Sequence, residues 1–376
     1  MSLITYLTRI QFETGAIDLL ASELALLKIN RPLIVTDKGV RAAGVLDAVL
    51  AGGGLSQPAI FDDTPGNPTE SAVLAARDLY LSAGCDGIVA VGGGSPLDLA
   101  KAVSLLATHP GALEQYAAIL GGIERIGPDK PAVIAIPTTA GTGSEVGRAA
   151  LITLEDGRKL GFLSPYMIPN VAICDPALTL KLPAGLTAAT GMDALTHCIE
   201  TFLSPRFNPP ADAIALDGLA RAVRYIARAY RDGGDLEARE GMMMASLQGG
   251  MTFQKGLGAV HGMSHALGGL KELRLHHGTL NAVILPAVLR FNKAGNEAKY
   301  AALRTAMGLS ENADVAEAIS TLNKELGMPE SLSQMGVPAD VLPLMVERAL
   351  ADHSTITNGR PVSADDYAKL FDEVSG

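Results

Sequence analysis

One carboxylate and several imidazoles occur in the second half of the sequence at spacings that suit a bound metal ion. In the segment GMDALTHCIE, Asp193 and His197 are four residues apart, so a helix would present both side chains on one face about one turn apart. The downstream segment VHGMSHALGGLKELRLHHGTLNA contains four further histidines, which are His261, His265, His276 and His277. Carboxylate and imidazole donors together suit Fe(II), Zn(II) or a similar divalent ion. We therefore expect a metal site here, and we expect the isolated His109 and His353 to be packing residues.

A glycine-rich turn in the first half is predicted to bind the pyrophosphate of a dinucleotide. The run DGIVAVGGGSPLDLAK joins an apolar strand pattern to a helical pattern through three consecutive glycines. Glycines let backbone N–H groups approach a ligand closely, and a helix N-terminus favours an anion. The residues predicted to bind the cofactor at this turn are Gly93, Gly94, Ser95 and Asp98. A helix capped by Ser95 and Asp98 as a capping box, without a ligand, is the alternative. The spacing differs from G-x-G-x-x-G, so an ordinary Rossmann fingerprint is not expected.

Two further segments are predicted to meet the glycine turn at the carboxyl edge of the same sheet. The polar loop PTTAGTGSEV follows an apolar run and supplies Thr138 and Thr139. Asp37 ends the apolar run RPLIVTD. A carboxylate there can accept hydrogen bonds from ribose hydroxyls and would repel a 2′-phosphate, which favours NAD over NADP. The alternative is that Asp37 only caps the helix that begins with KGVRAAG.

The elements that must hold these residues fall into two regions of different pattern. Short β-branched runs alternate with helical segments in the first region, which predicts a parallel sheet with crossover helices. These runs are residues 31–37, 58–63, 86–94, 131–139 and 170–176. From about Leu186 onward only helical patterns remain. We expect an α/β dinucleotide-binding domain at residues 1–182 and an all-helical metal-binding domain at 183–376, with the boundary at LKLPAGL.

Composition limits the partners and the compartment. The chain has 376 residues, which suggests two domains, and its formal charge of −10 without a basic cluster argues against nucleic acid. It contains no run of roughly 18 apolar residues and no leader pattern, so a membrane partner is not expected. The three cysteines are far apart, so neither a disulfide framework nor a cysteine zinc site is expected. A cytoplasmic enzyme acting on a small molecule is the resulting expectation.

The motifs together resemble the iron-dependent (group III) alcohol dehydrogenase family over essentially the whole chain. They are GGGSPLDLAK, PTTAGTGSE, GMDALTHCIE, HGMSHALGG and HHGTLNA. The resemblance implies the dehydroquinate synthase-like fold of that family, NAD as cofactor, Fe(II) or else Zn(II) as metal, and a homodimer or larger homo-oligomer. The metal ligands that it implies are Asp193, His197, His261 and His277. Family members usually have Pro where His276 stands, so the choice between His276 and His277 remains open.

The same resemblance implies the remaining roles. His265 would face the nicotinamide, and Asn67 and Lys159 would join the nucleotide contacts. A divalent ion would lower the pKa of an alcohol, and hydride would pass to C4 of the nicotinamide. The proton could leave through His265 or through water and the ribose hydroxyls.

Within the family, the chain most resembles the 4-hydroxybutyrate dehydrogenase branch, which implies interconversion of 4-hydroxybutyrate and succinate semialdehyde. A substrate carboxylate favours a nearby cation, and Arg148 in GTGSEVGRAALIT is our candidate, with Arg274 and Lys255 as alternatives. Arg148 could instead pair with Glu145 or reach solvent. The alternative functions are a general short-chain alcohol dehydrogenase, a dehydroquinate synthase-like lyase and a binding protein without enzymatic activity.

Overall fold

The computed structural model describes residue 4, residues 8–273 and residues 275–376. The chain divides into two compact units. The first unit includes residues 8–139 and Gly143–Leu182, and the second includes Ala140–Thr142 and Pro183–Gly376. The short segment Ala140–Thr142 therefore packs with the helical unit although its flanking residues belong to the α/β unit.

A six-stranded sheet forms the centre of the first unit, and all neighbouring strands in it are parallel. In spatial order its strands are β1 (Arg9–Phe12), β8 (Val171–Cys174), β5 (Val133–Pro137), β4 (Gly87–Gly92), β2 (Pro32–Val35) and β3 (Ala59–Phe61). The parallel sheet predicted from the sequence is confirmed, and each of the predicted runs contains one strand. The edge strand β1 was not predicted, because RIQF is short and half polar.

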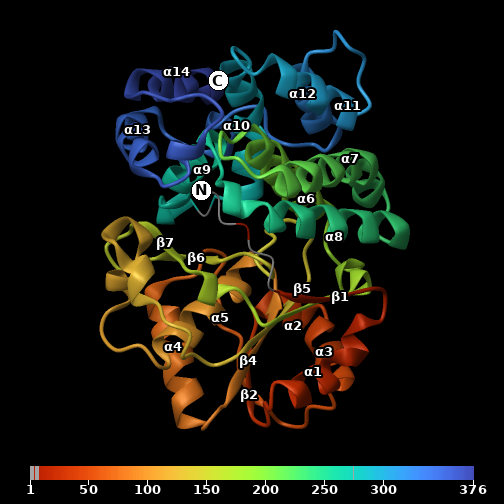
Figure 1. The fold of residues 1–376 in the computed structure, drawn as a ribbon, viewed down its shortest axis with the longest axis vertical. Coiled ribbons are helices and arrows are strands. Elements are labelled where there is room, and N and C mark those ends of the chain that lie inside the picture. The colour runs from red at the N-terminus through yellow and green to blue at the C-terminus, as the bar shows by residue number, and fades with distance from the viewer. Residues whose placement is uncertain (1–3, 5–7, 274) are drawn as a thin grey trace. The chain divides into compact units, whose positions relative to one another are not determined.

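Alternating side chains along the central strands build two cores, one on each face of the sheet. Ile88 and Ala90 of β4 face a core that includes α4 and α5, whereas Val89 and Val91 face a core that includes α1 and α3. These helices are α1 (Leu20–Leu26), α3 (Val45–Gly52), α4 (Glu70–Ser82) and α5 (Gly94–Leu106) (Figure 1). Because both faces are covered, the strand is apolar along its whole length rather than at alternate positions.

A separate antiparallel hairpin covers part of the same core as α5. Its strands are β6 (Ala149–Thr153) and β7 (Lys159–Leu163). Ile152 and Phe162 bury their side chains in that core. The hairpin was not predicted from the sequence, and it determines where Arg148 and Lys159 lie in the first unit.

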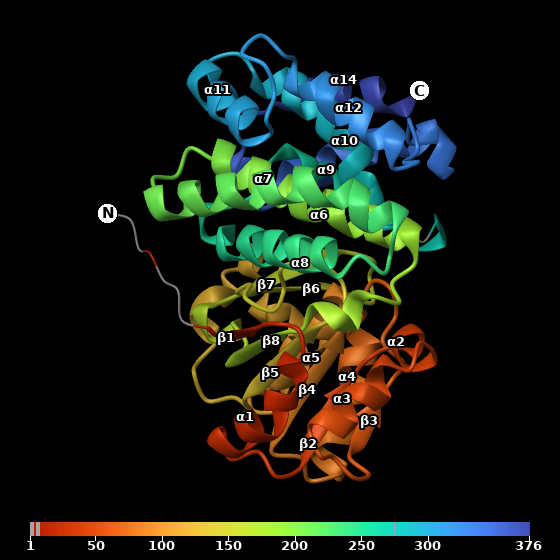
Figure 2. The same ribbon diagram turned by 90° about the vertical axis from the view of Figure 1, so that its right-hand side faces the viewer.

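The second unit is helical, as the sequence predicts. Its helices are α6 (Ala184–Leu203), α7 (Pro209–Arg231), α8 (Leu236–Met251), α9 (Ala259–Gly268), α10 (His277–Asn292), α11 (Glu297–Ala306), α12 (Val315–Glu325), α13 (Leu342–Ala351) and α14 (Ala364–Ser375). Helices α6, α7 and α8 pack side by side (Figure 2). Every residue of α6 from Thr187 to Leu203 is buried, so this helix forms the centre of the unit. Within the described residues, no helix combines the length and the apolar character that crossing a membrane requires.

Candidate active site

The carboxylate of Asp193 lies at the centre of a cluster of imidazoles inside the helical unit. Its Oδ1 atom is 3.5 Å from Nε2 of His197, 3.7 Å from Nε2 of His261 and 3.6 Å from Nε2 of His277. Donor atoms that share one ion at about 2.1 Å in tetrahedral geometry lie about 3.4 Å apart. The three distances to Oδ1 are therefore close to what one bound ion requires, and the donor atoms of Asp193, His197 and His261 all lie within 4.8 Å of one another.

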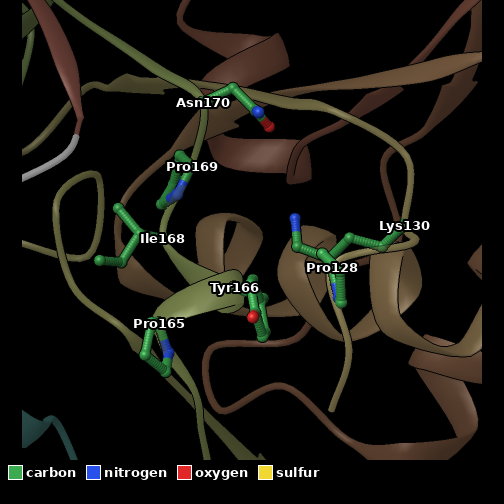
Figure 3. A pocket seen from close by; sticks show the side chains of 7 residues that line it. All are labelled: Pro128, Lys130, Pro165, Tyr166, Ile168, Pro169 and Asn170. Carbon is green, nitrogen blue, oxygen red and sulfur yellow. The ribbon is translucent and has the colours of Figure 1, made fainter.

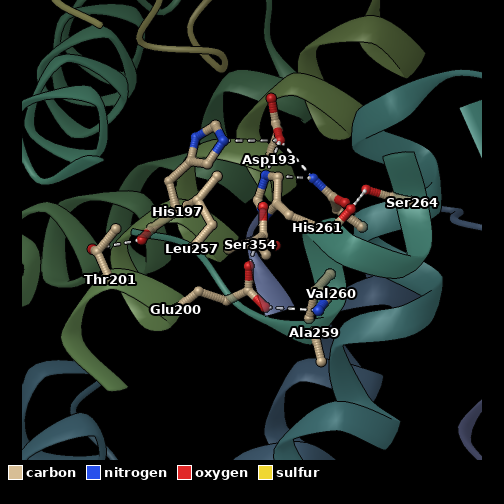
Figure 4. Close-up of polar contacts among 12 residues, drawn as sticks. Asp193, His197, Glu200, Thr201, Leu257, Ala259, Val260, His261, Ser264 and Ser354 are labelled. Carbon is tan, nitrogen blue, oxygen red and sulfur yellow. Dashed lines mark hydrogen bonds and ion pairs between the residues drawn. The ribbon is translucent and has the colours of Figure 1, made fainter. Parts of the chain in front are cut away.

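The other ring nitrogen of each of these three histidines contacts an oxygen acceptor. The pairs are His197 Nδ1 with the Gly141 carbonyl oxygen at 3.2 Å, His261 Nδ1 with Glu200 Oε2 at 2.6 Å and His277 Nδ1 with Ser264 Oγ at 3.4 Å. Figure 4 shows His261 between Asp193 and the Glu200 side of the cluster. With Nδ1 donating to these oxygens, each Nε2 keeps a lone pair directed at the shared centre.

Asn281 provides a further test of whether these residues fit a metal ion. Its Nδ2 atom is 2.7 Å from Asp193 Oδ1, 3.3 Å from His261 Nε2 and 3.2 Å from His277 Nε2. Its Oδ1 atom is buried and has no hydrogen-bond partner among the described residues. Buried polar atoms are nearly always satisfied, so the polar surroundings of Asn281 are incomplete next to the donor atoms that its Nδ2 contacts. Three imidazoles and one carboxylate are a donor set that fits Fe(II) or Zn(II).

The electrostatics of the cluster keep Asp193 and His197, but not His261, in forms that can bind a cation at neutral pH. Burial favours the neutral form of Asp193, but the neighbouring imidazoles outweigh it and hold the pKa of this carboxyl far below its usual range. Burial lowers the pKa of His197 to about 4, so this ring is neutral at pH 7. For His261, burial is outweighed by Asp193 and Glu200, which raise its pKa to about 9. A metal ion must therefore displace a proton from His261 at neutral pH.

The two adjacent histidines occupy different environments. His276 precedes α10 as its N-cap, is exposed, and has Nδ1 3.4 Å from Thr279 Oγ1. His277 begins the helix and turns toward Asp193. Close approach of α10 to α6 is possible because Gly278 follows, since a Cβ atom there would lie 2.1 Å from the carbonyl oxygen of Ala189.

His265 lies beside this cluster and has a carboxylate partner of its own. Its ring stacks on that of His277, with centroids 5.4 Å apart and an interplanar angle of 11°. Its Nδ1 atom is 3.0 Å from Oδ2 of Asp352, while Nδ1 of His353 is 3.6 Å from Oδ1 of the same aspartate. The interpretation of His353 as an isolated packing residue is therefore wrong, because its side chain is 34% exposed and belongs to this polar group.

In the first unit, the glycine turn after β4 has a backbone that a side chain would obstruct. Gly92 has φ of 150°, and a Cβ atom there would lie 2.6 Å from Pro96. Helix α5 begins at Gly94 with Gly93 as its N-cap. The predicted capping box is wrong, because Ser95 lies within the helix and its hydroxyl donates to the carbonyl oxygen of Gly66 at 2.8 Å.

Asp98 points away from the helix N-terminus and holds the second loop. Its Oδ1 accepts from the Ser144 hydroxyl at 2.5 Å and its Oδ2 from the backbone N–H of Leu151 at 2.9 Å. The fully buried Lys101 donates to Ser144 Oγ at 2.7 Å and to the carbonyl oxygens of Gly147 and Ala149. These contacts fix the loop on α5, so they account for Asp98 without a nucleotide. A direct contact between Asp98 and the cofactor stays a prediction.

Most of the other predicted nucleotide residues follow the carboxyl ends of strands β3 and β5, and Lys159 contacts one of them. The backbone N–H of Thr138 donates to the carbonyl oxygen of Gly92 at 3.0 Å, and the Thr139 side chain lies against Gly93. Lys159 donates to Asn67 Oδ1 at 3.0 Å.

Asp37 performs the capping role that the sequence left open. Its Oδ1 accepts from the backbone N–H of Val40 at 2.9 Å and caps α2 (Lys38–Ala42). Its Oδ2 atom lies on the side of Gly92, 3.4 Å from where a Cβ atom of that glycine would stand. One carboxylate oxygen therefore caps the helix, and the ribose contact predicted for Asp37 would involve the other.

Two protein-family models match the chain, one in each unit. The family model for iron-containing alcohol dehydrogenase matches residues 8–176, and the model for the C-terminal part of the Fe-containing alcohol dehydrogenase family matches residues 187–374. The chain belongs to the iron-containing alcohol dehydrogenase family. It is an oxidoreductase by this membership.

Individual members of the family resemble the chain over its full length. A 4-hydroxybutyrate dehydrogenase of Cupriavidus necator is 56% identical, with 99% of this chain and 100% of that protein covered. The crystal structure of a 1,3-propanediol oxidoreductase superposes with a TM-score of 0.93 at 37% identity, covering 99% of this chain and 100% of the other. A sulfoacetaldehyde reductase from Bifidobacterium kashiwanohense, solved in complex with NAD⁺, has a TM-score of 0.90 at 25% identity, covering 100% and 99%.

The basic side chains that could bind a substrate carboxylate in this alcohol dehydrogenase have different surroundings. Arg148 immediately precedes β6 and is partly buried. Lys255 is fully buried, forms an ion pair with Asp212, and donates to the carbonyl oxygen of Phe202 at 3.4 Å. It is therefore committed to the end of α6 and is not a suitable substrate clamp. Arg274 lies outside the described residues.

A pocket of about 240 Å³ occurs elsewhere in the α/β unit of this alcohol dehydrogenase (Figure 3). Lys130 and Asn170, which line it, precede β5 and β8 respectively, so it lies at the amino edge of the sheet. The glycine turn follows β4 at the opposite, carboxyl edge. The pocket contains none of the predicted site residues.

Several residues of the site, Ser264 among them, were missed by the sequence interpretation. Glu200 follows His197 by three residues and Asn281 follows His277 by four, so helical spacing alone could have identified both. Gly141 belongs to the loop PTTAGTGSEV that we expect near the nucleotide, and the contact of its carbonyl oxygen with His197 was not foreseen. Asp352 has no sequence signal that connects it with His265, because 87 residues separate them.

Proposed function

We propose that the chain catalyses the NAD-dependent interconversion of 4-hydroxybutyrate and succinate semialdehyde, with Fe(II), or alternatively Zn(II), held by Asp193, His197, His261 and His277. The observation that carries the metal assignment is the convergence of three Nε2 atoms within 3.5–3.7 Å of one buried carboxylate oxygen. The substrate assignment is supported by the 56% identical 4-hydroxybutyrate dehydrogenase.

In this reaction, hydride passes from the hydroxyl carbon to C4 of the nicotinamide and the hydroxyl proton is released. The metal ion, when bound, supplies a Lewis acid that lowers the pKa of the hydroxyl group. The chain's own residues hold the donor atoms in place through the oxygen acceptors behind each imidazole. We assign His265 to the nicotinamide side of the cluster.

The nucleotide contacts that we propose extend over the carboxyl edge of the sheet. They are Asp37, Asn67, Gly93, Gly94, Ser95, Asp98, Thr138, Thr139 and Lys159. Two hydrogen bonds support this grouping, one from Thr138 to the glycine turn and one between Lys159 and Asn67. Residues 1–182 would then form the nucleotide-binding domain and 183–376 the metal-binding domain.

Arg148 is our proposed partner for the substrate carboxylate. Arg148→Ala should lower kcat/KM for 4-hydroxybutyrate by roughly 10- to 100-fold, which corresponds to the loss of a charged hydrogen-bonded pair worth about 1.5–3 kcal/mol. Oxidation of butan-1-ol, which lacks the carboxylate, should hardly change. NADH formation followed at 340 nm with the iron-loaded enzyme measures both.

Arg158→Ala is the matched control, because Arg158 lies in the same hairpin and pairs with Asp156 and Glu114 at the surface. Equal losses on the two substrates would assign Arg148 to the fold or the cofactor loop, and the enzyme would be a general short-chain alcohol dehydrogenase. Absence of NADH formation from 4-hydroxybutyrate by the wild type with either metal would exclude the proposed reaction.

We further propose a homodimer or larger homo-oligomer in the cytoplasm. Ile119, Leu120 and Ile123 are 44–56% exposed on neighbouring turns, and an exposed apolar cluster of this kind favours association. All three cysteines are unpaired, which is typical of a reducing compartment. Sedimentation velocity of the purified protein tests the assembly, and a monomer at micromolar concentration would contradict it.

A further inference from the structure

Asp352 is held so that it can act on only one ring nitrogen of His265. It directly follows α13, and its Oδ1 accepts from the backbone N–H of Ser354 at 2.8 Å. Its Oδ2 is 3.0 Å from Nδ1 of His265. Both side chains are largely buried, with exposed fractions of 11% and 4%. The backbone bond therefore fixes the carboxylate, and the carboxylate fixes the imidazole.

A carboxylate can only accept a hydrogen bond, so Nδ1 of His265 must carry the proton. In the neutral ring the other nitrogen, Nε2, then has a free lone pair. Stacking restricts the ring plane as well, because His265 lies 5.4 Å from His277 and 5.8 Å from His353 with interplanar angles of 11° and 18°. Both the tautomer and the orientation of His265 are thus determined by its neighbours.

We propose that Asp352 is a positioning residue that keeps His265 in the Nδ1–H tautomer, so that Nε2 accepts a hydrogen bond from the substrate hydroxyl during oxidation. The proposal rests on the proposed function for the identity of that hydroxyl. It differs from the metal assignment, because Nε2 of His265 is not among the atoms that converge on Asp193. The Nδ1 atoms of the three proposed histidine ligands also contact oxygen acceptors, but there the Nε2 atoms are directed at Asp193 and the proposed metal position.

Asp352→Asn tests the tautomer directly. The asparagine can keep the Ser354 bond through Oδ1, which turns its NH₂ group toward His265 Nδ1 and forces that atom to become an acceptor. The proton then moves to Nε2 and blocks the lone pair. We expect kcat for 4-hydroxybutyrate to fall by about 100-fold or more, as for loss of a general acid–base contact, with KM for NAD changed less than about 3-fold.

A second readout does not depend on turnover. The chain has only seven histidines, so ¹⁵N-histidine labelling of the zinc-loaded protein allows each ring to be assigned by NMR, with His265→Gln identifying the resonances of His265. We expect a protonated Nδ1 for His265 in the wild type and a protonated Nε2 in Asp352→Asn. If the wild-type enzyme oxidised no alcohol, the proposed function would fail while the NMR result still decided the tautomer.

Two further variants separate positioning from folding. Asp352→Ala removes the carboxylate without supplying a donor, so His265 keeps access to both tautomers and kcat should fall less than in Asp352→Asn. Asp366→Asn weakens the capping box of α14 in the same C-terminal region and should lower only the melting temperature. Protonated Nε2 in the wild type, or a larger loss of kcat in Asp352→Ala than in Asp352→Asn, would overturn the proposal.

Discussion

Glu200 should contribute strongly to metal affinity although it does not contact the proposed metal position. Its Oε2 is 2.6 Å from His261 Nδ1, and its Oε1 accepts from the backbone N–H of Val260 at 2.7 Å. In Glu200→Gln the amide oxygen can keep the Val260 bond, so the NH₂ group faces His261. Nδ1 then becomes an acceptor and the proton moves to Nε2, the atom directed at Asp193.

The expected magnitude follows from the burial of this pair. The exposed fractions of the His261 and Glu200 side chains are 1% and 2%, so solvent does not screen the interaction. A buried hydrogen bond to a charged group contributes about 1.5–3 kcal/mol, which predicts a rise in the Kd for Zn(II) of about 10- to 100-fold. Substitutions of such outer partners in other metal sites have effects of the same size.

The loss of zinc affinity expected for Glu200→Gln depends on pH. In the metal-free protein Glu200 also raises the pKa of His261, which reaches about 9, and the proton on His261 competes with the metal. Removing Glu200 weakens that competition, so the loss of affinity in Glu200→Gln should be smaller at pH 7 than at pH 8.5. Competition with a chelator, measured at both pH values on metal-free protein, gives the two dissociation constants.

Glu237→Gln is the control, because Glu237 is an exposed carboxylate of α8 that pairs with Arg228. It should leave the Kd for zinc unchanged. A Kd for Glu200→Gln within about 3-fold of the wild type at pH 8.5 would refute the argument that Glu200 fixes the tautomer of His261.

Three other predictions address the ligand, the cofactor and the buried charge. His277→Ala should lose stoichiometric metal and His276→Ala should keep it, because of the two only His277 directs Nε2 at Asp193. Metal analysis of both purified variants tests this. The opposite result would assign the ligand to His276. Asp37→Gly should narrow the preference for NAD over NADP in kcat/KM by removing repulsion of the 2′-phosphate, and an unchanged ratio would leave Asp37 with its capping role alone. Burial raises the pKa of Glu145 from 4.5 to about 7, so the folded protein holds a proton on this side chain that the unfolded chain releases, and the contribution of Glu145 to the free energy of unfolding should fall as pH rises through that interval. This fall amounts to at most about 3 kcal/mol, and Glu145→Gln should abolish it. Urea unfolding of the cofactor-free proteins at several pH values measures it. If the free energy of unfolding changed with pH equally in the wild type and in Glu145→Gln, the raised pKa would be contradicted.

The sequence predicted the fold where a single local pattern determines it. The buried strands of the sheet are continuous β-branched runs, and the helices of the second unit have clear periodicity, so both were identified. Strand β1 and the hairpin β6–β7 were missed because their segments are short and mix polar with apolar residues. Their pairing depends on neighbours that are distant in the sequence, such as β8 for β1.

In the functional site, too, contacts within one element could be predicted and contacts between distant segments could not. The i, i+4 spacing of Asp193 and His197 is a property of one helix, and it could be read directly. The capping box at Ser95 was a local pattern too, but it was wrong because Asp98 instead bonds Ser144 and Leu151, which belong to another segment. A local motif predicts a contact only when no distant partner offers the same group a better hydrogen bond.

The acceptors behind the four imidazoles explain why this part of the site could not be predicted as a motif. The Nδ1 atoms of His197, His261, His277 and His265 contact a backbone carbonyl, a glutamate, a serine hydroxyl and an aspartate. The physical requirement is only an oxygen acceptor on the Nδ1 side, and it specifies neither a residue type nor a spacing. The acceptors differ in strength, because a buried carboxylate stabilises a bound N–H more than a hydroxyl at 3.4 Å does. His277 combines this weakest acceptor with a side chain that is 27% exposed, compared with 1% for His261 and 4% for His197. His277 is therefore the most exposed of the three proposed histidine ligands.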